Sequence, residues 1–143
     1  MTRLVRTFAC AASLTAIMGV AALVPASSQQ PAPATKVTTM MKEALAELPG
    51  REVIVITLDI PPGAGSPPHR HPGHHVFGYV LEGTYKIKVD QGPEQVLTKG
   101  QTFHEKPGQL HAVSANGSQT EPAKVLAFIV AESGKPITVP EKQ

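Results

Sequence analysis

Short apolar runs separated by turns dominate the chain from residue 53 to residue 130. Residues 85–90 read Tyr-Lys-Ile-Lys-Val-Asp, so apolar and polar positions alternate without a break. On a β-strand this alternation gives one buried face and one wet face. Further β-rich runs lie at residues 53–58, 76–81, 95–98, 102–104, 112–114 and 125–130. Short strands that end at Gly or Pro every eight to twelve residues or so predict an all-β sandwich or barrel.

One segment before these runs has a different period. Between residues 39 and 48 the apolar residues recur at helical spacing, and Pro49-Gly50 follows as a stop signal. These apolar residues are Met40, Met41, Ala44, Leu45 and Leu48. The pattern predicts one short amphipathic helix that packs on the outside of the barrel.

The N-terminus has the pattern of a secretory signal peptide. Arg3 and Arg6 precede an apolar run over residues 8–24, and small residues follow at Ala26. This pattern favours a cleaved signal over residues 1–26, and hence a periplasmic or secreted protein, more than a retained membrane anchor. Residues 27–38 are rich in Ser, Gln, Pro and Ala and predict a flexible leader. A single domain is expected over residues 39–143, with its barrel core at about 53–130.

Charge and cysteine usage exclude several classes of protein. Arg3 and Arg6 account for the excess of 13 Lys and Arg over 11 Asp and Glu, so the remaining chain is close to neutral. A nucleic-acid partner is not expected, because no basic patch appears. Cys10 is the only cysteine and lies inside the predicted signal. Disulfides, thiolate ligands and cysteine nucleophiles are therefore not expected in the exported domain.

All six histidines fall between His69 and His111. His69 and His71 are separated by one residue, so on an extended strand both imidazoles project from the same face. His111 follows a Pro-Gly turn and comes from a different strand. Two histidines from one strand and a third from another form a facial ligand set for a metal ion, with open positions opposite.

The histidines stand in two glycine-bounded blocks. Residues 63–83 contain His69-x-His71 and then the strand sequence Tyr-Val-Leu-Glu-Gly; residues 100–116 contain Lys-Pro-Gly-x2-His111. Together these blocks resemble the two motifs of the cupin family, in its small single-domain form. The resemblance implies a double-stranded β-helix, the jelly-roll barrel, in which the three histidines hold a divalent transition metal in the barrel mouth.

The chain departs from the family motif at one ligand. Cupins place a Glu four or five residues after the second histidine of the first block, and here those positions hold His75 and Val76. Either His75 replaces the carboxylate as a fourth ligand, with His74 as a further alternative, or the position is empty and water or substrate completes the site. Imidazole ligands suit Fe, Mn, Ni, Cu or Zn, and they leave the full 2+ charge on the ion.

Glu105 is the candidate catalytic residue. It precedes the turn to His111, so its side chain either points inward, where it would orient a ligand or accept a proton, or forms a surface ion pair. We expect an enzyme whose small substrate chelates the metal through adjacent oxygens, with a dioxygenase-like or isomerase-like reaction. The alternative is a barrel that binds a small molecule or metal without turnover. The resemblance also implies a homodimer, and no membrane association is expected once the signal is removed.

Overall fold

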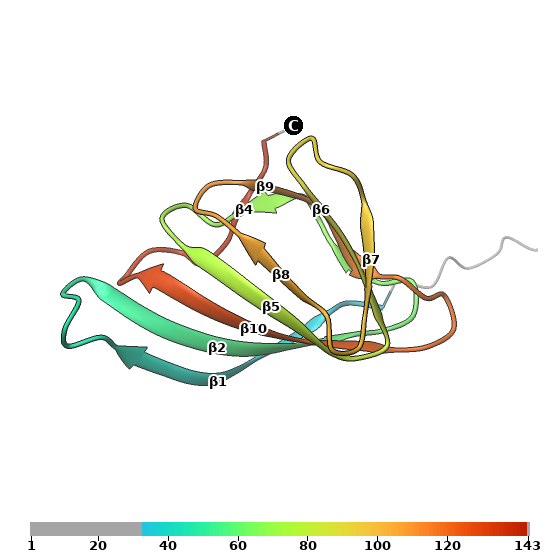
Figure 1. Cartoon of the computed structure of the whole chain (residues 1–143), viewed down its shortest axis with the longest axis horizontal. Helices are drawn as coiled ribbons and strands as arrows, with labels where there is room; N and C mark the ends of the chain where they lie inside the picture. Colours follow the sequence, from blue (N-terminus) through green and yellow to red (C-terminus); the bar gives the residue numbers. More distant parts are fainter. Residues whose placement is uncertain (1–32, 143) are drawn as a thin grey trace, which may run out of the picture. The chain divides into compact units, whose positions relative to one another are not determined.

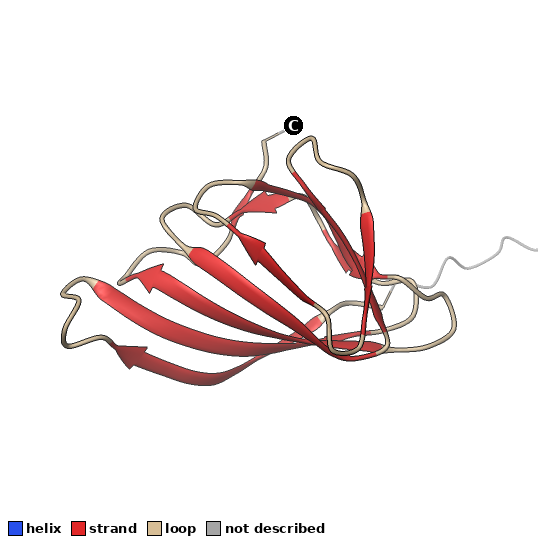
Figure 2. Cartoon of the chain, viewed as in Figure 1, coloured by secondary structure: helices blue, strands red, loops and turns tan. Residues whose placement is uncertain are grey.

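The structure is a computed structural model, and it describes residues 33–142. All regular secondary structure within these residues is β (Figure 2). The strands are β1 (Lys36–Ala44), β2 (Arg51–Ile60), β3 (Gly65–Ser66), β4 (His69–Arg70), β5 (His75–Glu82), β6 (Thr84–Val89), β7 (Gln95–Thr98), β8 (Thr102–Glu105), β9 (Leu110–Asn116), β10 (Ala123–Glu132) and β11 (Val139–Pro140). Each run that the hydrophobic pattern assigned to a strand is confirmed, with bounds that differ by a few residues.

The strands form two antiparallel sheets. One sheet has the order β1-β2-β10-β5-β8, and the other has the order β11-β4-β9-β6-β7 with β3 paired to β9 (Figure 1). Strands far apart in sequence are neighbours, because β10 lies between β2 and β5. This all-β architecture of two sheets is the one that the sequence predicts.

Alternating burial along the strands creates a core between the two sheets. In β10 the buried residues Val125, Ala127 and Ile129 alternate with more exposed ones. Val125 belongs to a cluster that also contains Val80 of β5 and Tyr85 of β6, so this cluster joins the two sheets. Full burial of a side chain such as Ile129 stabilises the fold by roughly 1.5–3 kcal/mol.

The helix that the pattern predicted over residues 39–48 is not present. Residues Lys36–Ala44 form β1 instead, which pairs along β2 with a bulge between Thr39 and Met41. The Met pair that suggested a helix is exposed, at 63% for Met40 and 45% for Met41. The helical prediction was wrong because β-branched residues before Met40 favour a strand, and because the edge of β2 offers backbone hydrogen bonds.

The predicted signal peptide, residues 1–26, lies outside the described residues, and so does the first half of the predicted leader, residues 27–32. β1 begins at Lys36, inside the stretch that was predicted as leader. Among the described residues there is no helix with the length and hydropathy to span a membrane.

Two glycines allow close approaches that shape the barrel. Gly83 has a φ of +69° in the turn between β5 and β6, and a Cβ there would clash with the carbonyl oxygen of Pro122. At Gly78 a Cβ would clash with the ring of Phe103. The absence of a side chain at Gly78 therefore lets Phe103 lie against β5, where it lines the inner cavity.

Candidate metal centre

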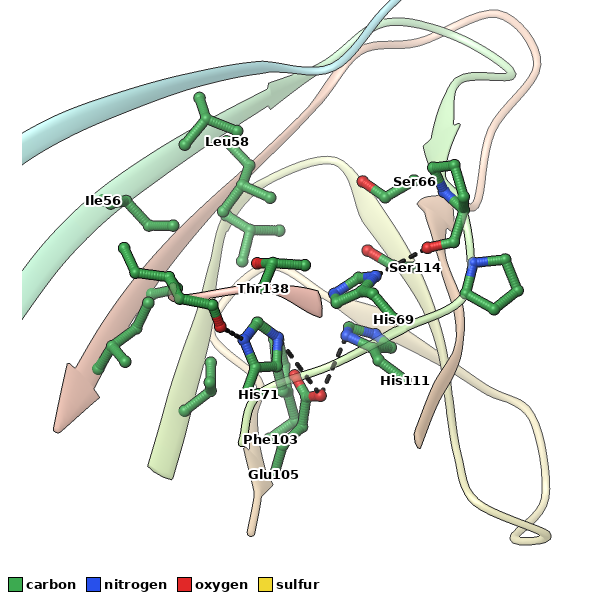
Figure 3. Close-up of a pocket in the computed structure, with 18 of the residues that line it drawn as sticks. Ile56, Leu58, Ser66, His69, His71, Phe103, Glu105, His111, Ser114 and Thr138 are labelled. Carbon is green, nitrogen blue, oxygen red and sulfur yellow. Dashed lines mark hydrogen bonds and ion pairs between the residues drawn. The ribbon is translucent and has the colours of Figure 1, made fainter. Parts of the chain in front are cut away.

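Three histidines converge at one point inside the barrel (Figure 3). His69 of β4 is directly paired with His111 of β9, and His71 follows β4 immediately. Each imidazole offers one ring nitrogen, and these nitrogens lie within 4.8 Å of one another. The structure therefore confirms that His69 and His71 project from the same face, and that His111 joins them from another strand.

Backbone carbonyls fix the ring orientation of the first two histidines. Nδ1 of His69 lies 2.8 Å from the carbonyl oxygen of Pro67, and Nδ1 of His71 lies 2.6 Å from that of Ile137. A carbonyl oxygen only accepts, so both Nδ1 atoms carry the hydrogen and donate it. Nε2 of His69 and of His71 is then unprotonated, which is the form that binds a metal.

His111 is held by a phenol instead of a carbonyl. Its Nε2 lies 3.3 Å from the hydroxyl of Tyr85, and that hydroxyl lies 2.7 Å from Oγ of Ser114. Burial raises the pKa of Tyr85, so the phenol stays protonated, and either hydroxyl can donate in the hydrogen bond between Tyr85 and Ser114. When Nε2 of His111 donates to Tyr85, Nδ1 keeps its lone pair and is available to a metal.

Glu105 lies beside ring nitrogens of His111 and His71. It is 1% exposed, and its Oε2 lies 3.1 Å from Nδ1 of His111 and 3.9 Å from Nε2 of His71. Among the described residues, Oε2 of Glu105 and Nδ1 of His111 are buried without a hydrogen-bond partner. The inward orientation is therefore the correct alternative for Glu105, and a surface ion pair is excluded.

This arrangement fits a divalent transition metal. Three unprotonated imidazole nitrogens are the ligand type that Fe, Mn, Ni, Cu and Zn accept. Buried polar atoms without partners are uncommon in native proteins, and a cation between Glu105 and His111 would satisfy both of them. A hydrogen bond also orients each histidine from its other ring nitrogen, as is usual for metal ligands.

Burial keeps the first two imidazoles in the neutral form. Desolvation is the largest cause that lowers the pKa of His69, and the hydrogen bond to Pro67 opposes it. Desolvation likewise lowers the pKa of His71 most, and the negative charge of Glu105 opposes it. A neutral imidazole is the ligand form, so the environment prepares both residues for a metal.

The structure does not bring His75 into this cluster, so the predicted fourth ligand is wrong. In β5 the side chain of Val76 is buried and faces inward, whereas His75 is on the opposite face. There Nδ1 of His75 lies 3.0 Å from Nε2 of the exposed His104, whose ring stacks on Phe77. β5 begins at His75, so the alternation of side chains along the strand already applies to this residue and directs it away from the cluster.

His74, the other alternative, is a core residue. It is completely buried, and its Nδ1 accepts the backbone N–H of Glu132 at 3.0 Å. Its Nε2 therefore donates to the carbonyl oxygen of Pro136, also at 3.0 Å. Both ring nitrogens are occupied, so His74 has no lone pair to offer a metal.

Sequence reasoning missed the contribution of the C-terminal strap, which we define as residues 136–141. Its Ile137 orients His71, and β11 within the strap pairs with β4, so Pro140 lies opposite His69. Arg70, between the two ligands in sequence, donates to Glu141 and to the carbonyl oxygen of Gly108. Nothing in the pattern of the strap indicated this role, because its contacts are made mainly through backbone atoms.

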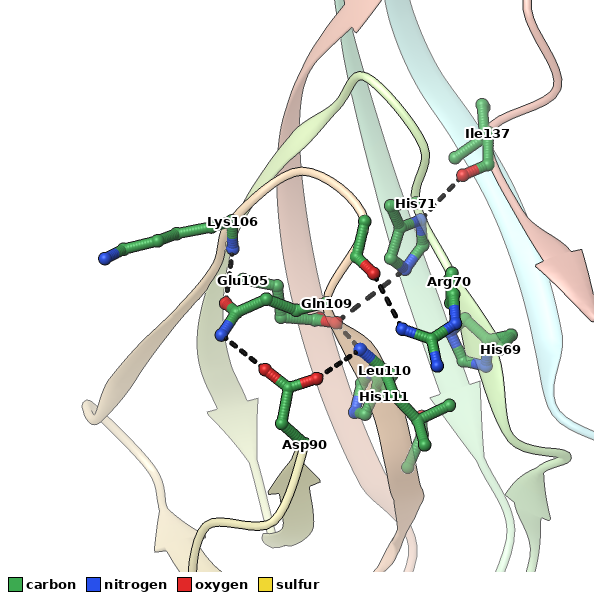
Figure 4. Close-up of polar contacts among 12 residues, drawn as sticks. His69, Arg70, His71, Asp90, Glu105, Lys106, Gln109, Leu110, His111 and Ile137 are labelled. Atoms are coloured by element: carbon green, nitrogen blue, oxygen red, sulfur yellow. Dashed lines mark hydrogen bonds and ion pairs between the residues drawn. The ribbon is translucent and has the colours of Figure 1, made fainter. Parts of the chain in front are cut away.

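A second support fixes the turn that leads to His111 (Figure 4). The carboxylate of Asp90 accepts the backbone N–H of Leu110 and the side-chain amide of Gln109, both at 2.8 Å. The amide oxygen of Gln109 in turn accepts the backbone N–H of Lys106 at 2.8 Å. These hydrogen bonds lower the pKa of Asp90 and hold the strand register that places His111 in the site.

The three histidines lie at one side of a cavity of about 320 Å³. Its walls are largely apolar and include Ile56, Leu58, Val125, Ala127 and Ile129. Its polar lining consists of the ligand histidines, Glu105 and hydroxyl groups such as those of Ser66 and Thr138. Among the described residues that line it there is no Lys or Arg, so no fixed cation of the protein faces a bound molecule.

The model of a family described as "Cupin domain" matches residues 56–129, which contain all three histidines and Glu105. No curated protein matches the chain in sequence. Among solved structures, an uncharacterized conserved protein with a double-stranded beta-helix domain from Klebsiella pneumoniae aligns with a TM-score of 0.62 and 16% identity. That alignment covers 80% of this chain and 90% of the other.

Two further structures are similar. The cupin domain of Cnp3 from Schizosaccharomyces pombe aligns with a TM-score of 0.58 and 16% identity, over 69% of this chain and 66% of that one. A recombinant oxalate oxidase in complex with glycolate aligns with a TM-score of 0.55 and 27% identity. The alignment covers 74% of this chain but 54% of the oxalate oxidase chain, so this chain corresponds to about half of that protein.

Proposed function

This chain belongs to the cupin family, and we propose that it is a metal-dependent enzyme acting on a small, oxygen-rich substrate that chelates the metal. The observation that carries the proposal is the convergence of His69, His71 and His111, each with a free ring nitrogen, beside an apolar cavity. A divalent transition metal bound there would supply a Lewis acid that polarises the substrate oxygens. The reaction class is dioxygenase-like or isomerase-like.

The cavity favours a substrate with two chemically different ends. The end near the histidines faces groups that suit oxygen atoms, whereas Ile56, Leu58 and Ala127 offer apolar contact further away. The lining, among the described residues, contains no Lys or Arg. A multiply charged anion would therefore bury negative charges that do not reach the metal and have no positive side chain to pair with. A diketone, a hydroxy acid or an aromatic diol with an apolar body meets these requirements.

The similarity to oxalate oxidase supports the chelating end of this substrate. The structure of that protein contains glycolate, a hydroxyl group beside a carboxylate, and identity with this chain is 27%. Two adjacent oxygens of this kind occupy two neighbouring positions on a metal. The three histidines here would leave such positions open toward the cavity.

The residues of this chain position and shield the substrate. Ser66 and Thr138 line the cavity with hydroxyl groups that donate hydrogen bonds to oxygens of a bound molecule. The apolar walls exclude water, which strengthens electrostatic interactions inside the cavity. Phe103 lines the cavity beside Tyr85, and the centroids of the two rings are 5.3 Å apart.

One observation favours a second candidate function, a barrel that binds its ligand without turnover. Glu105 is the only carboxylate among the described residues that line the cavity. Proton transfer needs a base that is free of other bonds, so a role of Glu105 in holding the metal would leave the enzyme without an obvious base. The barrel would then sequester a small chelating molecule.

Turnover separates the two candidates. The untagged protein is loaded in turn with Fe(II), Mn(II), Ni(II) and Zn(II), then mixed with β-diketones, 2-hydroxy acids and catechols, while oxygen uptake and the NMR spectrum of the substrate are followed. We expect turnover with at least one metal, and none in the His69→Ala/His111→Ala variant. Tight binding of a compound that stays unchanged with every metal contradicts the enzyme and supports the binding barrel.

We further propose that residues 1–26 direct export to the periplasm or the medium, and that the domain assembles as a homodimer. The charged start and apolar run of this segment support export. N-terminal sequencing of the protein recovered from the periplasm and its mass in solution test these two proposals.

A further inference from the structure

The carboxylate that the first histidine block lacks is present on the neighbouring strand. Val76 of β5 stands at the motif position where cupins carry Glu, and it faces inward and is buried. Its direct partner across the antiparallel pair of β5 and β8 is Glu105. Side chains directly opposite each other have Cβ atoms about 4.5–5.5 Å apart and share a face of the sheet. Glu105 therefore brings a carboxylate to the place that β5 leaves apolar.

The atoms around Glu105 are arranged as if a cation lay between them. A carboxylate oxygen only accepts hydrogen bonds, and Nδ1 of His111 presents a lone pair in the tautomer in which Nε2 donates to Tyr85. The two atoms are 3.1 Å apart and buried, yet they form no hydrogen bond. In that tautomer the two buried lone pairs repel each other unless a positive charge, such as a metal ion, separates them.

The distances agree with shared coordination. Metal–nitrogen and metal–oxygen bonds of about 2.0–2.2 Å separate neighbouring ligand atoms by roughly 3–3.5 Å. Oε2 of Glu105 lies 3.1 Å from Nδ1 of His111 and 3.9 Å from Nε2 of His71. Glu105 is not in the group of ligand atoms that lie within 4.8 Å of one another, so side-chain rotations must bring its carboxylate closer to His69 and His71. No Lys or Arg is among the described residues that line the cavity, so a cation of the protein is not the charge that Glu105 meets.

We infer that Glu105, through Oε2, is the fourth protein ligand of the metal that His69, His71 and His111 hold. The inference rests on the proposed metal site, and it moves the carboxylate ligand from β5 to β8. The charge of the ion is then half cancelled, so the site favours a neutral or singly charged chelating substrate over a doubly charged one. Glu105 then holds the metal, so the proposed enzyme would rely on polarisation of the substrate oxygens by the metal and not on Glu105 as a base.

Cobalt(II) binding to the untagged apoprotein tests this role without any assay of activity. The variant Glu105→Gln keeps the shape and an oxygen that accepts a hydrogen bond, but it lacks the charge of the carboxylate. We expect the dissociation constant for cobalt(II) to rise by at least roughly 10- to 100-fold, the range seen when groups that support a metal are removed. The cobalt absorption spectrum changes, and metal-induced shifts of the carboxylate infrared bands in the wild type are absent from the variant.

A transfer of the carboxylate between the two strands supplies the matched control. In the Val76→Glu/Glu105→Val variant the side chains of one cross-strand pair are exchanged, so the volume and charge of the pair are conserved. We expect this variant to bind cobalt(II) within a few-fold of the wild type, whereas Glu105→Val alone binds it weakly. Circular dichroism verifies that each variant is folded. If the exchanged variant does not fold, the cobalt(II) affinity of Glu105→Gln alone tests whether Glu105 is a ligand.

The outcomes separate this inference from the metal site itself. Wild-type affinity and an unchanged cobalt spectrum in Glu105→Gln overturn the inference, provided that His111→Ala has lost the metal. A folded exchanged variant that binds no better than Glu105→Val also overturns it. Wild-type protein that binds no cobalt(II) overturns the metal site and the inference together.

Discussion

Arg70 and Glu141 form a two-point ion pair that joins β4 to the end of the C-terminal strap. Nε of Arg70 lies 2.6 Å from Oε2 of Glu141, and one terminal nitrogen lies 2.9 Å from Oε1. Arg70 stands between His69 and His71, and the strap donates and accepts further backbone hydrogen bonds along β4. The ion pair therefore holds the segment that carries two metal ligands against the segment that orients one of them.

Removal of this pair weakens metal binding more than it weakens the fold. In Glu141→Gln one charged acceptor of Arg70 is lost, so Ile137 and the ring of His71 gain freedom, and we expect a few-fold rise of the dissociation constant for metal. The pair is partly exposed, so high salt narrows the difference between variant and wild type. Titration with metal at low and high salt measures the effect.

Asp59→Asn is the control for that experiment, since it breaks an exposed ion pair with Lys124 away from the cluster. It is expected to leave metal affinity unchanged. An equal loss of metal affinity in both variants would show that the loss comes from the change in the net charge of the protein and not from the loss of the contact between Arg70 and the strap.

His74 supports the structure and not the chemistry. His74→Ala leaves the N–H of Glu132 and the carbonyl of Pro136 without their buried partner, and it creates a cavity. We expect the free energy of unfolding to fall by about 2–4 kcal/mol. His104→Ala, on the exposed face, is expected to cost less than about 1 kcal/mol. Urea unfolding of the metal-free proteins measures both, and equal losses would contradict the assignment of His74 to the core.

The metal-free protein loses stability as pH falls below the ordinary histidine pKa of about 6.5. The pKa of His69 and of His71 is lowered in the fold, so the unfolded chain binds more protons in the window just below 6.5. Stability is therefore full above this pH and decreases as pH falls toward the folded-state pKa values. Urea midpoints between about pH 8 and about pH 5 measure the decrease. A decrease of the same size in a His69→Asn/His71→Asn variant would show that other groups cause it.

Sequence patterns predicted the strands of the barrel well where apolar and polar residues alternate regularly. The strict alternation of residues 84–89 left one arrangement for β6, because a shift of one residue would expose Tyr85 and Ile87. The pattern failed at β1, where Met40 and Met41 match helical spacing although tertiary pairing with β2 decides the conformation. Such pairing depends on a segment that is distant along the chain, which local spacing does not contain.

The site was predictable to the same degree. His69, His71 and His111 follow from spacing and from the resemblance to cupins, and the structure brings them together. His75 was misassigned because the alternation of side chains was not expected to hold at the junction of loop and strand; β5 includes His75, so His75 and the inward-facing Val76 lie on opposite faces. The inward position of Glu105 depends on the register of β8 against β5, which sets Glu105 opposite Val76 and cannot be read from either strand alone.

The central claim is that His69, His71 and His111 hold a metal ion, and the metal content and affinity of the untagged protein test it most directly. We predict about one equivalent of a divalent transition metal per chain in the wild type. Replacement of any one of these three histidines by Ala weakens binding by more than roughly 100-fold, beyond the loss seen for groups that only support a ligand. His75→Ala binds like the wild type. A folded wild type that takes up no Fe(II), Mn(II), Co(II), Ni(II) or Zn(II), or three variants that bind as tightly as the wild type, would contradict the account.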